Sequence, residues 1–191
     1  MSLTRFERTH LPVTPWKNGG GTTSEIVCQP AGATMDGFDW RVSIAHIASD
    51  GPFSAFPGID RVITLLEGAG VHLHTSDGRV DHRLDQPLVP FAFAGEAPVQ
   101  ADLLAGDCHD FNVMTRRAAW RASVTVLHDD AELPACAQGL LYAVRGRWSA
   151  GAQRLQADEG LWWNDTLTRW FLHPETADAA MIAVHIESIA P

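Results

Sequence analysis

The sequence predicts an all-β protein built as two packed barrels or sandwiches, and three observations support this fold class. Short β-leaning runs separated by Pro, Gly and Asp recur along the 191 residues. Continuous amphipathic helix patterns are missing, and the stretch ETADAA is long enough for one helical turn only. An apolar strand followed by a charged residue and a glycine occurs at 62–68 and again at 140–146, 78 residues later. A period of this length indicates a duplicated β-domain.

The first half opens with two β-leaning runs, TTSEIV (22–27) and DWRVSIAHI (39–47), which a Pro- and Gly-rich loop separates. Successive side chains of a strand point to opposite faces. Arg41 and Ser43 are therefore expected on one face of the second run, and three apolar residues beginning with Trp40 on the other. Two faces of such different character indicate a strand between two different environments.

The same signals, short β-leaning runs bounded by turn residues, predict the remaining strands and a second half of the chain. The polar, Pro-containing stretch 128–139 is expected to separate a first half, residues 1–127, from a second half, residues 128–191, within one compact unit. In each half an aromatic pair follows the repeated strand, Phe91 with Phe93 and Trp162 with Trp163. The remaining first-half strands are expected within RVITLLEGAGVHLHTSDGRV (61–80), LVPFAFAG (88–95), VQADLLAG (99–106) and DFNVMTR (110–116).

Composition and charge exclude several classes of partner. The formal net charge is −9, and no run of Lys or Arg exceeds two residues, so neither nucleic acid nor a membrane is expected to bind. Cys28, Cys108 and Cys136 form no CxxC motif, which argues against a disulfide framework or a zinc site and favours a reducing compartment. No apolar signal segment and no 18-residue apolar run occur, so we expect a cytoplasmic protein.

The glycine run in TPWKNGGGTTSEI (14–26) does not fit a phosphate-binding loop. A P-loop has its Lys after the last glycine and a helix behind it, whereas Lys17 precedes the glycines here and a β-leaning run follows. The dinucleotide-binding fingerprint also requires a helix at this point. Three glycines flanked by donors favour the wall of a ligand pocket, and the structural alternative is a tight corner that leads into a strand. The donors are Lys17, Asn18, Thr22 and Thr23.

His72 and His74 form an HxH pair, which places both imidazoles on the same face of a strand. A mononuclear metal site would add a Glu a few residues later and a third His on a later strand. The sequence HTSDGR supplies no Glu, and His109 comes far along the chain. No metal and no other cofactor are therefore predicted.

Buried charges supply the remaining candidates. Arg41 lies among apolar neighbours and must find a carboxylate, either from the protein or from a ligand. Asp110 and Asn112 share one face of their strand, and Glu25 shares a face with Thr23. Either these groups bind a ligand together, or Arg41, Glu25 and Asp110 form an ion network that only holds the barrel. No catalytic Ser/His/Asp or Cys/His arrangement stands out.

Four blocks of the sequence resemble the HutD/Ves family, whose members are encoded with histidine-utilisation enzymes in many bacteria. They are PWKNGGGTTSEI, WRVSIAHI, GPFSAFPGIDRVITLLEG and DFNVMTRR, and they occur in the family's order over residues 15–117. The resemblance implies a bicupin, that is, two cupin-like β-barrel halves in one chain. It also implies a small-molecule-binding protein that modulates histidine breakdown, without a firmly assigned enzymatic activity and without the usual cupin metal ligands.

The expected function is the binding of a small anionic metabolite such as formylglutamate, formiminoglutamate or urocanate. The alternatives are a metal-dependent cupin enzyme that acts on such a metabolite, built on His72 and His74, and a pure interaction module. A homodimer is left open. The expected ligand-binding residues lie in the first half: Lys17, Asn18, Gly20, Thr22, Thr23, Glu25, Arg41, Ser43, Arg61, Asp110 and Asn112.

Overall fold

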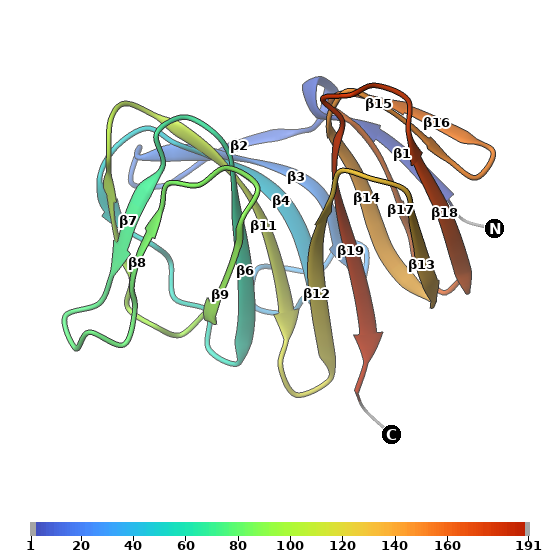
Figure 1. The fold of residues 1–191 in the computed structure, drawn as a ribbon. Coiled ribbons are helices and arrows are strands. Elements are labelled where there is room, and N and C mark those ends of the chain that lie inside the picture. Colours follow the sequence, from blue (N-terminus) through green and yellow to red (C-terminus); the bar gives the residue numbers. More distant parts are fainter. Residues whose placement is uncertain (1–2, 190–191) are drawn as a thin grey trace. The chain divides into compact units, whose positions relative to one another are not determined.

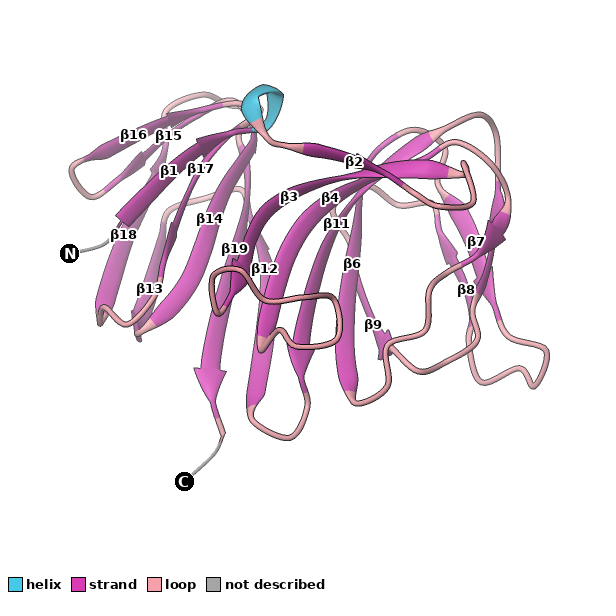
Figure 2. Ribbon diagram, turned by 180° about the vertical axis from the view of Figure 1, so that it is seen from behind, coloured by secondary structure: helices cyan, strands magenta, loops and turns pink. Residues whose placement is uncertain are grey.

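The computed structural model describes residues 3–189 and confirms the all-β prediction. In this part of the chain the regular structure consists of β-strands and one short 3-10 helix, η1 (Arg8–His10) (Figure 2). The described residues contain no helix long and apolar enough to cross a membrane. The chain divides into two compact units. We call Pro12–Arg121 with Ile189 the central unit, and residues 3–11 with Ala122–Ser188 the terminal unit.

The central unit consists of two antiparallel sheets, and the strands of its larger sheet lie side by side in Figure 1. The six-stranded sheet has the order β2 (Val13–Pro15), β3 (Gly21–Gln29), β4 (Trp40–Ile47), β11 (Cys108–Arg116), β6 (Ile59–Glu67) and β9 (Pro90–Ala94). The four-stranded sheet has the order β5 (Gly51–Pro52), β10 (Gln100–Leu103), β7 (Val71–His74) and β8 (Asp81–Leu84).

Both sheets contribute to one buried core in the central unit. Ile63 and Leu65 come from the six-stranded sheet, and Val71 and Leu73 come from the four-stranded sheet. Successive side chains of a strand point to opposite faces, which explains the burial pattern of β7. Val71 and Leu73 are buried, while the two histidines of this strand are half-buried. Burying one such aliphatic side chain stabilises the fold by about 1.5–3 kcal/mol.

The terminal unit also consists of two antiparallel sheets around a core rich in Trp and Leu. One sheet has the order β1 (Leu3–Glu7), β17 (Glu159–Trp163), β14 (Gln138–Arg145), β19 (Ala180–Ser188) and β12 (Trp120–Leu127). The other has the order β13 (Ala131–Cys136), β18 (Thr168–Pro174), β15 (Arg147–Ala150) and β16 (Gln153–Gln156). Trp148 and Trp163 lie in the core between them.

The two units repeat one strand order, as the duplicated sequence pattern predicts. The order β4-β11-β6-β9 of the central unit corresponds to β12-β19-β14-β17 of the terminal unit. The order β5-β10-β7-β8 likewise corresponds to β13-β18-β15-β16. The repeated motif at 62–68 and 140–146 falls on the equivalent strands β6 and β14, and the two aromatic pairs fall on β9 and β17. Two cupin-like halves in one chain account for this repetition.

The division between the units differs from the expected split near residues 128–139. Strand β1, at the start of the chain, pairs with β17, from Leu3 opposite Trp163 to Glu7 opposite Glu159. Strand β12 lies beside β19, so the chain changes units near residue 121. Strand pairing joins residues that are far apart in the sequence. A polar stretch such as 128–139 therefore does not indicate which strands belong to which unit.

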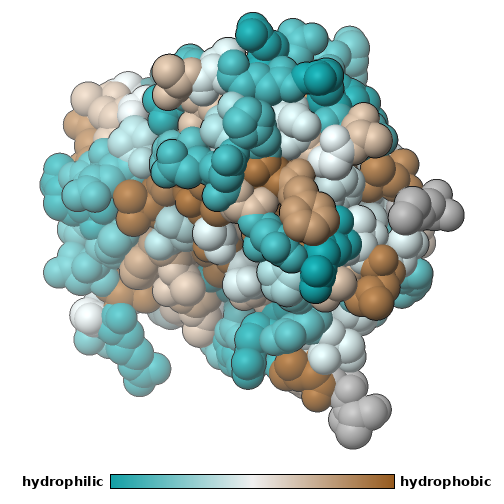
Figure 3. Space-filling view, turned by 45° about the vertical axis from the view of Figure 1, so that its right-hand side comes forward, coloured by the Kyte–Doolittle hydropathy of each residue, from teal (hydrophilic) through white to brown (hydrophobic). Residues whose placement is uncertain are grey.

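Exposed apolar side chains are spread over several elements. On the face seen in Figure 3, apolar residues form separate patches among hydrophilic ones. The large exposed ones come from different segments and include Val13, Met35, Leu167 and Phe171. Scattered apolar residues of this kind are ordinary on protein surfaces and mark no binding site by themselves.

Candidate functional site

A row of polar side chains lies on the inward face of the six-stranded sheet. Strand β11 lies between β4 and β6, and its residue Asn112 is opposite Ser43 on one side and Ile63 on the other. Two residues further along the strand, Met114 is opposite Arg41 and Arg61. Residues directly opposite each other in a sheet point to the same face. The structure therefore brings Arg41, Ser43, Arg61, Asp110 and Asn112 to one surface.

This surface looks into the core of the central unit. Ile63 and Leu65, which are opposite Asn112 and Asp110, pack in the cluster that includes the four-stranded sheet. The polar side chains are buried accordingly: Ser43 and Asp110 are each 1% exposed, and Arg61 and Asn112 are each 6% exposed. A polar group at this depth must be satisfied by the protein or by something bound.

Within the described part of the protein, one polar atom of each of four of these side chains has no hydrogen-bond partner. Among residues 3–189, buried side-chain atoms without a hydrogen bond include Ser43 Oγ, Arg61 Nε, Asp110 Oδ1 and Asn112 Oδ1. Each such atom costs about 1–3 kcal/mol, and native proteins contain few of them. Because four such atoms lie on one surface, the loss of folding free energy is concentrated there. A ligand with complementary donors and acceptors would recover it.

Arg61 is held by aromatic rings. Its guanidinium carbon lies 5.1 Å from the ring centres of Phe53 and of Phe93, and 5.8 Å from that of Phe56. Burial lowers the pKa of Arg61 to about 10, although the negative charge of Asp110 opposes this change. The side chain therefore remains a cation at neutral pH. Contacts with ring faces stabilise a cation without using its N–H donors, which stay available for an anion.

The Asp110 carboxyl group changes its protonation state in the range just below neutral pH. Burial raises the pKa of Asp110 to about 6, and the positive charge of Arg61 and a backbone hydrogen bond limit the rise. A neutral carboxyl group both donates and accepts hydrogen bonds, whereas a carboxylate only accepts them. The surface can thus present either kind of group to a ligand.

The Arg41 guanidinium has a protein partner. Its Nε donates a hydrogen bond of 2.7 Å to Glu25 Oε2, and Glu25 is partly exposed. The ion pair expected for Arg41 thus forms with Glu25, and Asp110 takes no part in it. On the same face of β3, the Trp16 indole Nε1 donates a hydrogen bond of 2.8 Å to Thr23 Oγ1. Glu25 and Thr23 border the polar row on the β3 side.

The glycine run forms the hairpin turn between β2 and β3. Asn18 Oδ1 accepts a hydrogen bond of 3.0 Å from the Gly20 backbone N–H, and Gly19 has a positive φ of 73°. Gly21 is opposite Ile47, six residues along β4 from Arg41, which corresponds to about 20 Å. The turn therefore lies at the far end of β3 from Arg41 and Arg61.

Four of the expected ligand-binding residues consequently lie apart from the polar row. Asn18 and Gly20 form the turn, and the exposed Lys17 side chain makes no hydrogen bond or ion pair among the described residues. Thr22 precedes Thr23 on β3, so its side chain points to the opposite face of the sheet, away from the polar row, where it is opposite His46. In the structure the glycine run forms a tight corner that leads into β3, at a distance from the polar row.

The HxH pair, considered above as a possible metal site, also faces away from this surface. His72 and His74 alternate with the core residues Val71 and Leu73, so their imidazoles lie on the outward face of the four-stranded sheet. They do not contribute to the inward polar row.

Comparison with known proteins identifies the family of this chain. The family model described as HutD matches residues 8–181. The chain belongs to the HutD family. It is 43% identical to Protein Ves of Escherichia fergusonii over 161 residues, which cover 84% of this chain and 82% of that protein. The family resemblance of the sequence blocks is therefore confirmed.

Two solved structures share the fold over nearly the whole chain. The structure of HutD from Pseudomonas fluorescens, solved in a formate condition, has a TM-score of 0.87 and 28% identity, covering 99% of this chain and all of that one. A conserved protein of unknown function from Pseudomonas aeruginosa has a TM-score of 0.83 and 31% identity, covering 98% of this chain and all of that one.

Sequence reasoning missed the aromatic part of the candidate site in this HutD family member. The rings of Phe53, Phe56 and Phe93 surround the Arg61 guanidinium. Phe53 and Phe56 lie in the loop that follows β5. Side chains in a loop do not alternate between two faces as those of a strand do, so no periodic signal assigns these two rings to Arg61.

The titration of Asp110 leads to a prediction about stability and pH. The folded-state pKa of about 6 lies above the usual 3.8, so the folded chain binds this proton more tightly than the unfolded chain. The resulting stabilisation is full below pH 4 and is lost as the pH rises through about 6. Asp110→Asn removes this dependence. Between pH 4 and 7 the wild type should lose about 2–3 kcal/mol of unfolding free energy relative to the variant.

Urea unfolding of both proteins at a series of pH values, without ligand, measures this difference. Taking the difference between wild type and variant cancels the contribution of the other titrating groups. Parallel pH profiles for the two proteins would contradict a raised pKa of Asp110.

Proposed function

We propose that this HutD family protein binds a small anionic metabolite on the inward polar surface of the central unit and acts in histidine utilisation as a binding, regulatory protein. The observation that carries the proposal is the set of unsatisfied buried atoms on Ser43, Arg61, Asp110 and Asn112. A fold retains such groups at a cost to stability, and functional sites are among the places where proteins do so.

The chemistry of these groups favours a ligand with a carboxylate at one end. Arg61 offers N–H donors in the planar arrangement that matches a carboxylate, and its aromatic surroundings exclude water that would compete.

The other side chains favour an amide-like or imidazole N–H. Asn112 Oδ1 and Asp110 Oδ1 are acceptors without a donor, and the Ser43 hydroxyl can donate or accept. Formylglutamate and formiminoglutamate carry carboxylates together with an N–H, and urocanate carries a carboxylate and an imidazole. Each of these histidine-derived compounds complements the two ends of the row.

A metal-dependent enzyme is the weaker candidate. Its expected ligands, His72 and His74, lie on the outward face of the four-stranded sheet and not beside the polar row. The inward row consists of guanidinium, hydroxyl, carboxyl and amide groups, which suit the recognition of a metabolite through hydrogen bonds and charge.

A thermal-unfolding screen tests the proposal. Formylglutamate, formiminoglutamate and urocanate are added separately, with histidine and glutamate for comparison. A ligand at a hundred times its dissociation constant stabilises the folded protein by about 2.7 kcal/mol, which raises the melting temperature by several degrees. Asn112→Leu should abolish the increase, because it removes the acceptor that the ligand N–H would use.

Lys17→Gln is the matched control. Lys17 is exposed in the turn at the far end of β3, so this variant should respond to the ligand as the wild type does. The proposal fails if none of the three compounds shifts the melting temperature. It also fails if Asn112→Leu, folded normally, retains the full response.

A further inference from the structure

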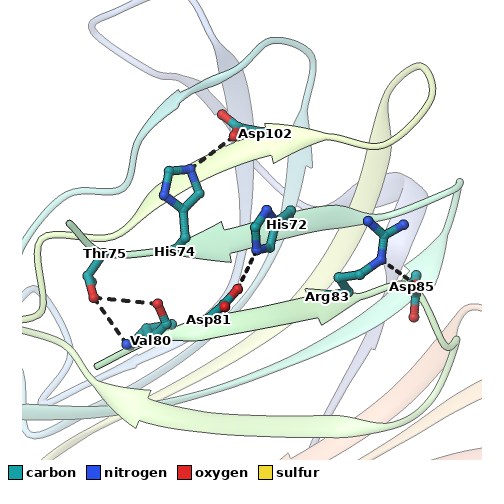
Figure 4. A network of polar contacts seen from close by, with 8 residues as sticks. All are labelled: His72, His74, Thr75, Val80, Asp81, Arg83, Asp85 and Asp102. Carbon is teal, nitrogen blue, oxygen red and sulfur yellow. Dashed lines mark hydrogen bonds and ion pairs between the residues drawn. The ribbon is translucent and has the colours of Figure 1, made fainter. Parts of the chain in front are cut away.

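The outward face of the four-stranded sheet carries a second cluster of polar side chains. His72 and His74 come from β7, which lies between β10 and β8. Asp102 on β10 is opposite His72, and Asp81 on β8 is opposite His74. Figure 4 shows the two imidazoles beside each other, each with a carboxylate next to it. Three neighbouring strands thus bring two imidazoles and two carboxylates together.

Each imidazole is oriented by a hydrogen bond to a carboxylate. His72 Nε2 lies 2.7 Å from Asp81 Oδ1, and His74 Nε2 lies 2.9 Å from Asp102 Oδ2. The ring centres are 5.1 Å apart. One potential ligand atom from each of His72, His74 and Asp102 lies within 4.8 Å of the other two. Among the described residues, this is the group with metal-ligand spacing.

We propose that His72, His74 and Asp102 bind a divalent transition-metal ion, Zn²⁺ or Ni²⁺, on this outward face. Ligand atoms about 2.0–2.2 Å from a tetrahedral ion lie roughly 3.4 Å from one another. All three side chains are partly exposed, so small rotations can bring their ligand atoms from 4.8 Å to this spacing. The β7 backbone need not move, because an HxH pair on a strand already points both rings to the same side.

Asp81 has a supporting role in this site. A metal-bound histidine usually holds a carboxylate at its other ring nitrogen, which fixes the orientation of the imidazole. Asp81 contacts His72 in this way and lies outside the three-ligand group. The nearby cation Arg83 is engaged by Asp85, with 3.1 Å between Nε and Oδ2, so negative charge predominates around the site.

The site is separate from the proposed metabolite-binding surface. Val71 and Leu73, which alternate with the histidines, belong to the core and separate the outward face from the interior. Loss of metal binding would therefore not remove metabolite binding, and the two proposals can fail independently.

The test is a calorimetric titration of the 191-residue chain, freed of any affinity tag, with ZnCl₂ and NiCl₂. We expect one ion bound per chain. His72→Gln with His74→Gln should weaken binding by at least about 100-fold, and Asp81→Asn should weaken it by about 10–100-fold, as loss of a supporting carboxylate usually does. MgCl₂ should not bind, because Mg²⁺ prefers an all-oxygen ligand set.

A second pair of histidines in the same unit provides the control. The rings of His46 and His109 stack with 4.6 Å between their centres, and His46 Nε2 lies 2.7 Å from Asp107 Oδ2. They resemble the proposed site in having paired imidazoles beside a carboxylate, but they are not part of the three-ligand group. His46→Gln with His109→Gln should bind Zn²⁺ as the wild type does.

Two outcomes would overturn the proposal. One is wild-type affinity for Zn²⁺ no higher than that of the His72/His74 double variant. The other is an equal loss of affinity in the control double variant, which would mean that exposed histidines bind the ion without a built site. Unchanged circular dichroism and melting temperature of each ligand-free variant ensure that neither result comes from unfolding.

Discussion

Gly21→Ala is expected to destabilise the protein by about 3 kcal/mol, at the upper end of the range for overpacking in a core. A Cβ atom at this position would lie well inside van der Waals contact with the His46 carbonyl oxygen on β4, and 3.1 Å from two carbons of the Trp16 ring. The carbonyl is part of the backbone and cannot turn aside as a flexible side chain can. Strands β3 and β4 would have to separate at the start of their pairing.

Gly20→Ala is the matched comparison within the same run. A Cβ atom at position 20 would lie 3.0 Å from Ser49 Oγ, 3.4 Å from Asn18 Oδ1 and 3.5 Å from Asn18 Nδ2. All three are side-chain atoms, which can move aside. We expect a loss of about 1 kcal/mol or less for this variant. Urea unfolding of both variants measures the difference. Equal stabilities for the two would show that the close approach at Gly21 does not constrain the fold.

The glycine run illustrates what the sequence could and could not reveal. Gly19 supplies a positive φ in the turn, and Gly21 permits the close approach of β3 to β4 and Trp16. Sequence alone indicates that three adjacent glycines serve some purpose, but not which atoms approach them. The approaching atoms belong to His46 and Trp16, and the His46 strand is brought there by long-range pairing.

Local periodicity predicted the faces of single strands well. Arg41 and Ser43 share a face, and so do Asp110 and Asn112, because alternation within a strand depends only on the strand itself. By the same rule Thr22 and Thr23 point to opposite faces of β3, so the sequence already indicated that they cannot both line one pocket. Which strands are neighbours is not a local property. The position of β11 between β4 and β6, which unites the polar row with Arg61, required the structure.

The duplicated architecture was predictable for a related reason. The repeated motif at 62–68 and 140–146 lies on the equivalent strands β6 and β14. The neighbouring strands of β6 and β14 occur in the same order in the two units. The pairing of β1 with β17 lies outside the repeat, because it joins the start of the chain to its second half. No pattern near Leu3–Glu7 specifies that partner, so the expected division of the chain did not include it.

Arg61→Met is expected to have two large effects of opposite sign. Without ligand, the variant should be more stable than the wild type by about 1–2 kcal/mol. It removes a buried guanidinium whose Nε donates no hydrogen bond, which outweighs the loss of its contacts with three phenylalanine rings. Affinity for an anionic metabolite should fall by about 2–5 kcal/mol, roughly 30-fold or more, the usual cost of removing one partner of a buried charge pair.

The conditions of this experiment follow from the neighbouring carboxyl group. Burial holds the pKa of Asp110 at about 6, so at a pH near 5 this group is mainly neutral in the wild type. Removal of Arg61 takes away a positive charge that favours the carboxylate, so Asp110 stays neutral under the same conditions in the variant as well. Urea unfolding and calorimetric titration at this pH therefore measure the effect of Arg61 itself.

Arg116→Met distinguishes a ligand-binding arginine from a structural one. The Arg116 side chain donates hydrogen bonds of 2.6 Å to the Phe38 carbonyl and 3.2 Å to the Asp36 carbonyl. Its loss should lower stability by about 1 kcal/mol and leave affinity unchanged. If Arg61→Met behaved in the same way, Arg61 would be a structural residue that the three rings hold in place. A gain in stability together with a loss of binding is the combination expected only when a charge is retained for a ligand at the expense of the fold.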